Sequence, residues 1–173
     1  GMTRVALLDY GVGNVGSVRR AFERLGAEVV TTSDPALVAE SSRVVLPGVG
    51  AFAPARARLA SSGLDGALRA AVGRGARLLG LCLGFQLLFE ASEEFGTTKG
   101  LGLLPGRVVP FAPGVRVPHV GWNRLETEGA AEGPLLAGLP RGTYVYFVHS
   151  FRPEGAEPGD VAAYCDHGGS FVA

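Results

Sequence analysis

The sequence predicts a three-layer α/β fold in its first half, followed by a mixed or antiparallel strand extension. Up to residue 100, short apolar runs alternate with segments of helical spacing, which is the pattern of strands joined by helices. One run, ARLLGLCL at 76–83, is continuously apolar, as strands buried on both faces of a parallel sheet are. After Gly100 the candidate strands are separated by Pro and Gly rather than by helices.

The predicted elements of the first half begin with the apolar strand VALLDY at 5–10. The glycine-rich GVGN follows, and then a helix with apolar residues at helical spacing until Gly26, namely Val15, Val18, Phe22 and Leu25. AEVVTTS at 27–33 predicts the second strand, and Asp34 with Pro35 predicts a helix cap and a first-turn proline. RVVL at 43–46 predicts the third strand, and a helix over 64–75 leads into the run at 76–83.

The second half predicts short strands within RVVPF at 107–111, GVRVPHVGWNRLE at 114–126, TYVYFVHSF at 143–151 and VAAYCDHGGSFVA at 161–173. The last of these segments is expected to form a hairpin that turns at DHGG. We expect residues 1–173 to form a single domain that is truncated at its C-terminal end, because GGSFVA enters a strand that the chain does not finish.

Composition narrows the classes of partner. Lys plus Arg equals Asp plus Glu at 16 each, so we expect neither nucleic acid nor anionic lipid as a partner. The uncharged stretch 78–89 is too short to span a bilayer, and the start lacks a basic region before its apolar run, so we expect a cytoplasmic protein without a membrane segment. Cys82 and Cys165 are then expected as free thiols. No cofactor is expected, because GVGN lacks the full dinucleotide-binding glycine pattern, and no metal site is expected either.

Cys82 is the candidate nucleophile. A lone cysteine in an apolar strand is most often a small buried hydrophobe, and composition alone favours that alternative. Gly80 and Gly84, however, give the spacing of a nucleophile elbow, at which a strand turns sharply into a helix expected from Phe85 onward. The helix dipole there favours thiolate, and the backbone N–H of Leu83 suits an oxyanion donor.

A second oxyanion donor is expected from PGVG at 47–50, where Gly48 and Gly50 would let the Val49 amide turn toward the developing charge. An ordinary tight turn is an equally open interpretation of this pair of glycines. Gln86 suits substrate binding or an exposed helix position, and Trp122 suits an interface anchor or the core. His149 ends an apolar strand and is the best-placed of the histidines, although no carboxylate partner is identified for any of them.

Six motifs occur in the order of a known family: DYGVGN at 9–14, LPGVG at 46–50, GLCLGFQLLFE at 80–90, KGLGLLPG at 99–106, PHVGWN at 118–123 and YFVHSF at 146–151. Over essentially its whole length the chain resembles the glutaminase subunits of imidazole glycerol phosphate synthase, which are class I glutamine amidotransferases of histidine biosynthesis. The resemblance implies a flavodoxin-like core. It also implies that Cys82 attacks the side-chain amide of glutamine, forms a thioester and releases ammonia, with Val49 and Leu83 holding the oxyanion.

The same resemblance implies how glutamine and the partner are bound. The glutamine would be held by Gly48, Gly50, Gln86, Ser150 and Phe151. The partner would be a synthase (cyclase) subunit with a (β/α)8 barrel, which forms a heterodimer with this chain and uses the ammonia to make imidazole glycerol phosphate and AICAR. The residues implied at that interface are Asn14, Trp122 and Asn123.

The family takes its base and orienting carboxylate from a His-Pro-Glu stretch that this sequence lacks. We therefore expect both groups beyond Ala173, and we expect His149 to be a neighbour of the substrate rather than the base. Phe85 stands where relatives often carry Met or His. Two other functions stay open: a stand-alone thiol hydrolase or redox or stress protein with the same elbow, and a catalytically silent binding subunit.

Overall fold

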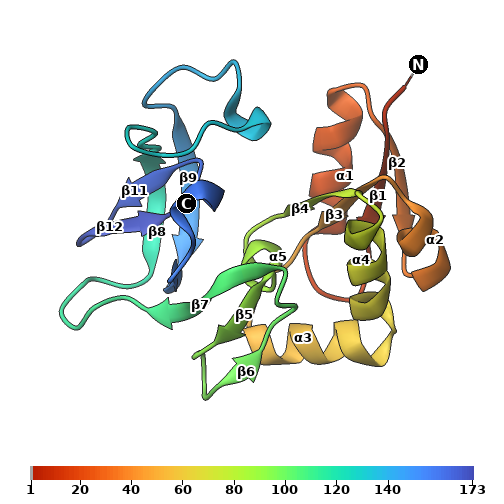
Figure 1. Cartoon of the computed structure of the whole chain (residues 1–173), viewed down its shortest axis with the longest axis horizontal. Helices are drawn as coiled ribbons and strands as arrows, with labels where there is room; N and C mark the ends of the chain where they lie inside the picture. Colours follow the sequence, from red (N-terminus) through yellow and green to blue (C-terminus); the bar gives the residue numbers. More distant parts are fainter. Residues whose placement is uncertain (1) are drawn as a thin grey trace.

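The first half of the chain forms a parallel sheet between two layers of helices (Figure 1). The computed structural model describes residues 2–173. The strand order is β2-β1-β3-β4, with β1 at Arg4–Leu8, β2 at Glu28–Thr32, β3 at Arg43–Leu46 and β4 at Arg77–Gly80. All neighbouring strands are parallel. Their carboxyl ends therefore meet at one edge, where the loops that follow β1, β3 and β4 come together.

Helices cover the two faces of this sheet unequally. On one face, α2 (Pro35–Glu40), α3 (Phe52–Ser61) and α4 (Leu64–Gly73) bury the main core together with sheet residues such as Leu8 and Leu46. On the other face, α1 (Val15–Arg24) packs half-buried side chains against a smaller cluster made by Val5, Leu7, Val29 and Val45. This is the three-layer α/β fold that the sequence predicts.

The chain from residue 89 onward forms a mixed sheet and two hairpins. The sheet has the order β10-β7-β5-β6, in which β5 (Phe89–Ser92) and β7 (Leu104–Pro110) are parallel, whereas β6 (Thr98–Lys99) and β10 (Phe151–Glu154) pair antiparallel at the edges. The hairpins are β8 (His119–Arg124) with β9 (Tyr144–His149), and β11 (Tyr164–Asp166) with β12 (Ser170–Val172). Two short 3-10 helices, at Pro134–Leu136 and Pro158–Asp160, lie in the loops. The predicted strand extension is confirmed, including the turn at DHGG.

The structure corrects two local expectations and adds one helix. Helix α3 was not predicted, and the helix expected from Phe85 onward is only α5 (Leu83–Gln86), after which the chain turns into β5. Leu25 does not continue the apolar face of α1, because it lies at the end of that helix with 85% of its surface exposed. The strand expected within 114–126 is confirmed as β8, which begins at His119 directly after Pro118, a residue with no N–H to donate to a ladder.

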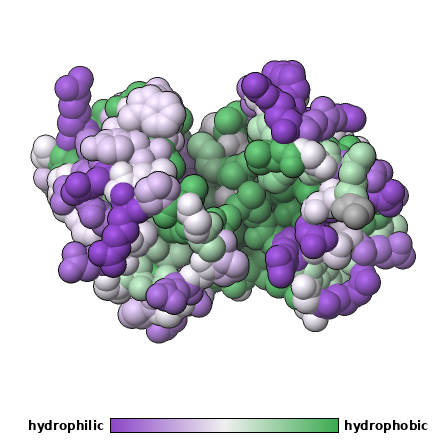
Figure 2. Space-filling view, turned by 90° about the horizontal axis from the view of Figure 1, so that it is seen from above, coloured by the Kyte–Doolittle hydropathy of each residue, from purple (hydrophilic) through white to green (hydrophobic). Residues whose placement is uncertain are grey.

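An apolar groove separates the two halves of the molecule on the α1 side of the sheet. Figure 2 shows it as a hollow of hydrophobic surface between two lobes with polar rims. Its walls come from both halves: Val5, Phe22, Val45 and Leu79 on one side, and Pro134 with Leu135 on the other. Among residues 2–173, none of the helices combines the length and apolar character that a bilayer crossing requires.

Candidate active site at the turn after β4

Cys82 sits in a backbone conformation that few residues adopt. Its φ is 55° and its ψ is −119°, and it forms the N-cap of α5 directly after β4. Such a conformation costs about 1–3 kcal/mol in a residue other than glycine, and strain of this kind gathers at active sites. The turn places Cys82 on the exposed side of the strand edge, whereas Cys165 is buried. The predicted elbow is therefore present.

The two flanking glycines are required by close backbone approach. A Cβ at Gly80 would lie 2.7 Å from the Cα of Phe85, and a Cβ at Gly84 would overlap the carbonyl of Leu46. Real Cβ atoms do not approach backbone that closely. The spacing of glycines around Cys82 thus lets β4 turn back into α5 while the turn rests on the end of β3.

The loop Pro47–Gly50 lies against this turn, as the sequence predicts. The backbone N–H of Leu83 donates a hydrogen bond to the carbonyl of Gly48 at 3.2 Å, and the N–H of Leu81 donates to Leu46 at 2.9 Å. Val49 is 54% exposed next to Gly50, whose φ is +90°. The structure thus brings both candidate oxyanion residues together, but in this conformation the Leu83 amide already has an acceptor.

A pocket of about 290 Å³ opens beside Cys82, close to the lower limit of about 300 Å³ that is usual for small-molecule sites. Phe85 and Gln86 of α5 line it, together with His149 and Phe151 from the other half of the chain. The Nε2 of Gln86 donates to the carbonyl of Phe151 at 3.4 Å. The predicted substrate residues on α5 and β10 therefore meet at one place, and Ser150 lies between two residues that line the pocket.

Three histidines cluster behind the pocket, and two of them, His119 and His149, form a chain of hydrogen bonds. Nδ1 of His149 lies 2.8 Å from the carbonyl of Phe151, which can only accept, so this nitrogen carries a hydrogen. Nε2 of neutral His149 must then accept, and it lies 2.7 Å from Nδ1 of His119, which donates. Nε2 of His119 in turn accepts from the side-chain amide of Asn123 at 3.1 Å. Every ring nitrogen in this chain has a partner of the right kind.

The surroundings favour the neutral forms of His119 and His149. Burial, reinforced by the neighbouring His149 and His167, lowers the pKa of His119 to about 4. Burial also lowers the pKa of His149, against the opposing effect of its hydrogen bond to Phe151. His167 stacks on His119 with ring centroids 4.2 Å apart, and its Nε2 donates to the carbonyl of Arg116 at 2.6 Å. The cluster therefore fastens the hairpin β8–β9 to β11–β12, and the lone pair of His149 is directed toward His119.

One face of the hairpin β8–β9 is apolar and exposed beside the pocket. Val120 pairs with Val148, and Trp122 pairs with Tyr146 across the two strands. These four side chains are between 53% and 71% exposed, and Tyr146 and Val148 also line the Cys82 pocket. The core alternative for Trp122 does not describe this chain, because Trp122 is 71% exposed.

The other two candidate interface residues have internal contacts. Asn14 caps α1, because its Oδ1 accepts from the N–H of Ser17 at 3.2 Å. Asn123 directs its amide to His119 and to the carbonyl of Asp166, which lies 2.9 Å from Nδ2. Asn123 thus stabilises the histidine cluster and does not share the exposed face of Trp122.

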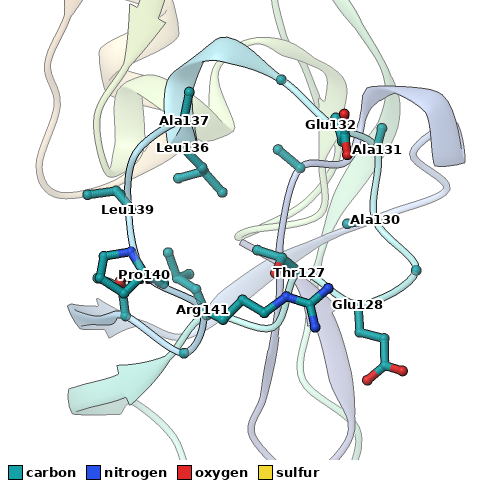
Figure 3. Close-up of a pocket in the computed structure, with 16 residues that line it drawn as sticks. Thr127, Glu128, Ala130, Ala131, Glu132, Leu136, Ala137, Leu139, Pro140 and Arg141 are labelled. Atoms are coloured by element: carbon teal, nitrogen blue, oxygen red, sulfur yellow. Dashed lines mark hydrogen bonds between the residues drawn. The ribbon is translucent and has the colours of Figure 1, made fainter.

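A separate hollow of about 500 Å³ lies in the loop between β8 and β9 (Figure 3). Small and apolar residues make up most of its wall, and Figure 3 shows Leu136 directed inward and Glu128 directed away. It contains neither of the cysteines nor any of the histidines. The exposed thiol of Cys82 and the polar groups that could orient a substrate lie at the smaller pocket instead.

The family model of class I glutamine amidotransferases matches residues 6–173, which include every element of this site. The chain belongs to the class I glutamine amidotransferase family. Among solved structures, PurLQS from Thermotoga maritima superimposes on this amidotransferase with a TM-score of 0.72 at 22% identity, covering 100% of this chain and 81% of that chain. A crystal structure of a glutamine amidotransferase gives a TM-score of 0.68 at 21% identity, covering 95% and 85%. At these identities the two structures support the fold.

Comparison with curated relatives shows which members of the family this amidotransferase is most similar to among those compared. The imidazole glycerol phosphate synthase subunit HisH of Synechococcus sp. (strain JA-2-3B'a(2-13)) is 47% identical over 170 residues, which are 97% of this chain and 77% of the relative. The same subunit of Moorella thermoacetica is 49% identical over 150 residues, which are 87% of this chain and 70% of the relative. Within its family, this amidotransferase belongs with the HisH glutaminase subunits, as the sequence motifs predict.

Proposed function

We propose that this chain hydrolyses glutamine at Cys82 and delivers the ammonia to a synthase subunit. The observation that supports this most directly is the strained turn of Cys82, which presents a free thiol at a pocket lined by Gln86 and Phe151. The sulfur of the thiolate attacks the side-chain carbonyl carbon of glutamine, and the C–N bond breaks as ammonia leaves with an added proton. Water then cleaves the thioester and gives glutamate. This chemistry requires no cofactor.

The oxyanion of each tetrahedral intermediate would be stabilised by the amides of Leu83 and Val49. Because the Leu83 amide donates to Gly48 in this structure, the carbonyl of Gly48 has to turn away before that amide can bind an oxyanion. A rotation of the Gly48–Val49 peptide would remove this carbonyl and bring the Val49 N–H to the same side. The glycines that flank Val49 make such a rotation inexpensive.

The general base of this reaction is not one of the three histidines, in our proposal. His149 lines the pocket, but its acceptor nitrogen is occupied by His119 and its other nitrogen donates to Phe151. His119 is 5% exposed, and its two nitrogens are bonded to His149 and Asn123. The match covers 77% of the length of the Synechococcus relative, so that protein has further residues outside the matched part. We infer that residues corresponding to this unmatched part supply the base and its carboxylate.

The partner would bind over the face formed by Val120, Trp122, Tyr146 and Val148. This face adjoins the Cys82 pocket, so a subunit seated on it would lie next to the place where ammonia forms. We propose a (β/α)8-barrel synthase as this partner, in a heterodimer that makes imidazole glycerol phosphate and AICAR, with Asn14 near the same contact. A free Cys82 thiol also favours the reducing cytoplasm as the compartment.

The test compares two nitrogen sources in the complex with the synthase subunit. Cys82→Ala should abolish imidazole glycerol phosphate synthesis from glutamine and leave synthesis from added ammonium salt unchanged. Loss of both activities would show that Cys82 is structural. Turnover of simple esters by the isolated chain, without turnover of glutamine in the complex, would instead support a stand-alone thiol hydrolase.

A further inference from the structure

Tyr10 reaches from the loop after β1 to the oxyanion loop after β3. Its hydroxyl donates a hydrogen bond to the carbonyl of Pro47 at 2.6 Å, across 37 positions of sequence. The ring is 6% exposed and packs in the main core with Leu46 and Leu83. A phenol this deeply buried keeps its hydrogen, because burial raises its pKa, so it acts as a donor throughout the physiological range.

Three consecutive carbonyls at the end of β3 each accept a hydrogen bond. Those of Leu46 and Gly48 accept from the amides of Leu81 and Leu83, which belong to the Cys82 turn. The carbonyl of Pro47 between them accepts from Tyr10. The loop is therefore fixed from both sides: two carbonyls bind the nucleophile turn, and the middle one binds the phenol.

Gly48 lies between the phenol and the nucleophile turn. A Cβ at this position would be 3.0 Å from the Tyr10 hydroxyl and 2.9 Å from the amide nitrogen of Gly84. The loop that carries Tyr10 is also packed close by, since a Cβ at Gly13 would lie 3.3 Å from the amide nitrogen of Gly48. This crowding leaves little room for the Pro47–Gly48 segment to move as a body.

We propose that Tyr10 is a positioning residue of the oxyanion site. By holding the Pro47 carbonyl, it limits the rearrangement that frees the Leu83 amide to the single Gly48–Val49 peptide. Without the hydroxyl, the loop would drift as a whole and the Val49 amide would no longer arrive at one fixed place. This role rests on the proposed glutaminase function, since it concerns the geometry of the same transition state.

The experiment uses Tyr10→Phe in the full chain, bound to the synthase subunit. Phenylalanine keeps the buried ring and removes only the hydroxyl. Tyr164→Phe is the control, because Tyr164 lies in β11, where its backbone pairs with Val172 and Glu126 and not with the loop. For Tyr10→Phe, kcat of glutamine hydrolysis should fall about tenfold and KM should change by less than about twofold. Ammonia-dependent synthesis should be unchanged, and the control should behave as the unmodified protein.

A second measurement separates positioning from simple packing and from failure of the proposed function. Amide hydrogen exchange at Leu83 should accelerate about tenfold in Tyr10→Phe while exchange at Leu81 stays constant, since only the loop beyond Pro47 is released. Equal acceleration at both amides, or a raised KM with unchanged kcat, would overturn the proposal. If the unmodified complex, with the residues that supply the base present, hydrolyses no glutamine, the proposed function fails, and the ratio of the two exchange rates still decides the role of Tyr10.

Discussion

The backbone N–H of Leu83 donates to the carbonyl of Gly48 at 3.2 Å, which joins the residue after the nucleophile to the loop that should complete the oxyanion site. An amide that already has an acceptor does not stabilise an oxyanion. In the proposed mechanism, the chain in this conformation therefore holds the Cys82 thiol at the pocket while the Leu83 amide is not available to an oxyanion.

Val49→Pro tests the second donor. Proline removes the backbone N–H that we assign to the oxyanion, and the Val49 side chain is 54% exposed, so little packing is lost. We expect kcat for glutamine in the complex to fall by about 10²–10³, the cost usual for one oxyanion donor, with KM little changed. Val49→Ala, which keeps the N–H, is the control and should retain most activity. Comparable loss in both variants would argue for a packing role.

A pair of substitutions at Cys82 tests the backbone strain. Both Cys82→Ala and Cys82→Gly remove the thiol, but glycine adopts φ of 55° without a Cβ penalty. Relief of strain outweighs the extra flexibility of unfolded glycine, so the glycine variant should be more stable to unfolding by about 1 kcal/mol. Chemical denaturation measures the difference. An alanine variant that is equally or more stable would mean that the turn relaxes at no cost.

The histidine cluster predicts a loss of stability in mild acid. His119 has a folded pKa of about 4, below the unfolded value of about 6.5. The unfolded chain therefore binds more protons between these values. The contribution of His119 to the free energy of unfolding is constant above about pH 6.5 and should decline as the pH falls toward 4. Denaturation midpoints across this range, with an NMR titration of the His119 ring, check it. In His119→Gln the decline should be shallower; a ring that titrates near 6.5 would refute the prediction.

The exposed hairpin face predicts an interface anchor. Trp122→Ala should weaken association with the synthase subunit by about 2 kcal/mol or more, as loss of an aromatic anchor commonly does, while the free chain keeps its melting temperature. Leu25→Ala is the control, because Leu25 is also an exposed large apolar residue, 85% exposed, but lies at the end of α1 that faces away from the Cys82 edge. Calorimetric titration gives both affinities. Equal affinities for the two variants would show that Trp122 is not an anchor of the interface.

Sequence patterns predict the parts of the fold that depend on residues close together in the chain. The elbow follows from two glycines around Cys82, and the parallel strands follow from short apolar runs. The sequence pattern does not predict helix α3, because its buried face consists of Phe52, Ala55 and Leu59, and the small alanine weakens the apolar periodicity. Pro54 also suggests a break in the helix. A proline in the first turn of a helix is tolerated, since no intrahelical acceptor exists there for its missing N–H.

Sequence patterns do not predict hydrogen bonds between segments that are far apart in the chain. The hydrogen bond from Tyr10 to Pro47 joins residues of two loops that only the parallel pairing of β1 and β3 brings together. The chain from Asn123 through His119 to His149 depends on the register of β8 and β9, which places His119 opposite His149. The spacing of residues in the sequence does not predict this register, so it does not predict that the histidines form one cluster.

The central claim, that Cys82 is the nucleophile of a glutamine site, is tested most directly by an electrophilic analogue of glutamine, such as a chloroketone that replaces the side-chain amide. Mass mapping after limiting exposure should find one adduct per chain on the peptide that contains Cys82, with none on buried Cys165. Added glutamine should slow the labelling, whereas added asparagine should not. Labelling of both cysteines alike, or labelling of Cys82 that glutamine does not slow, would contradict the account.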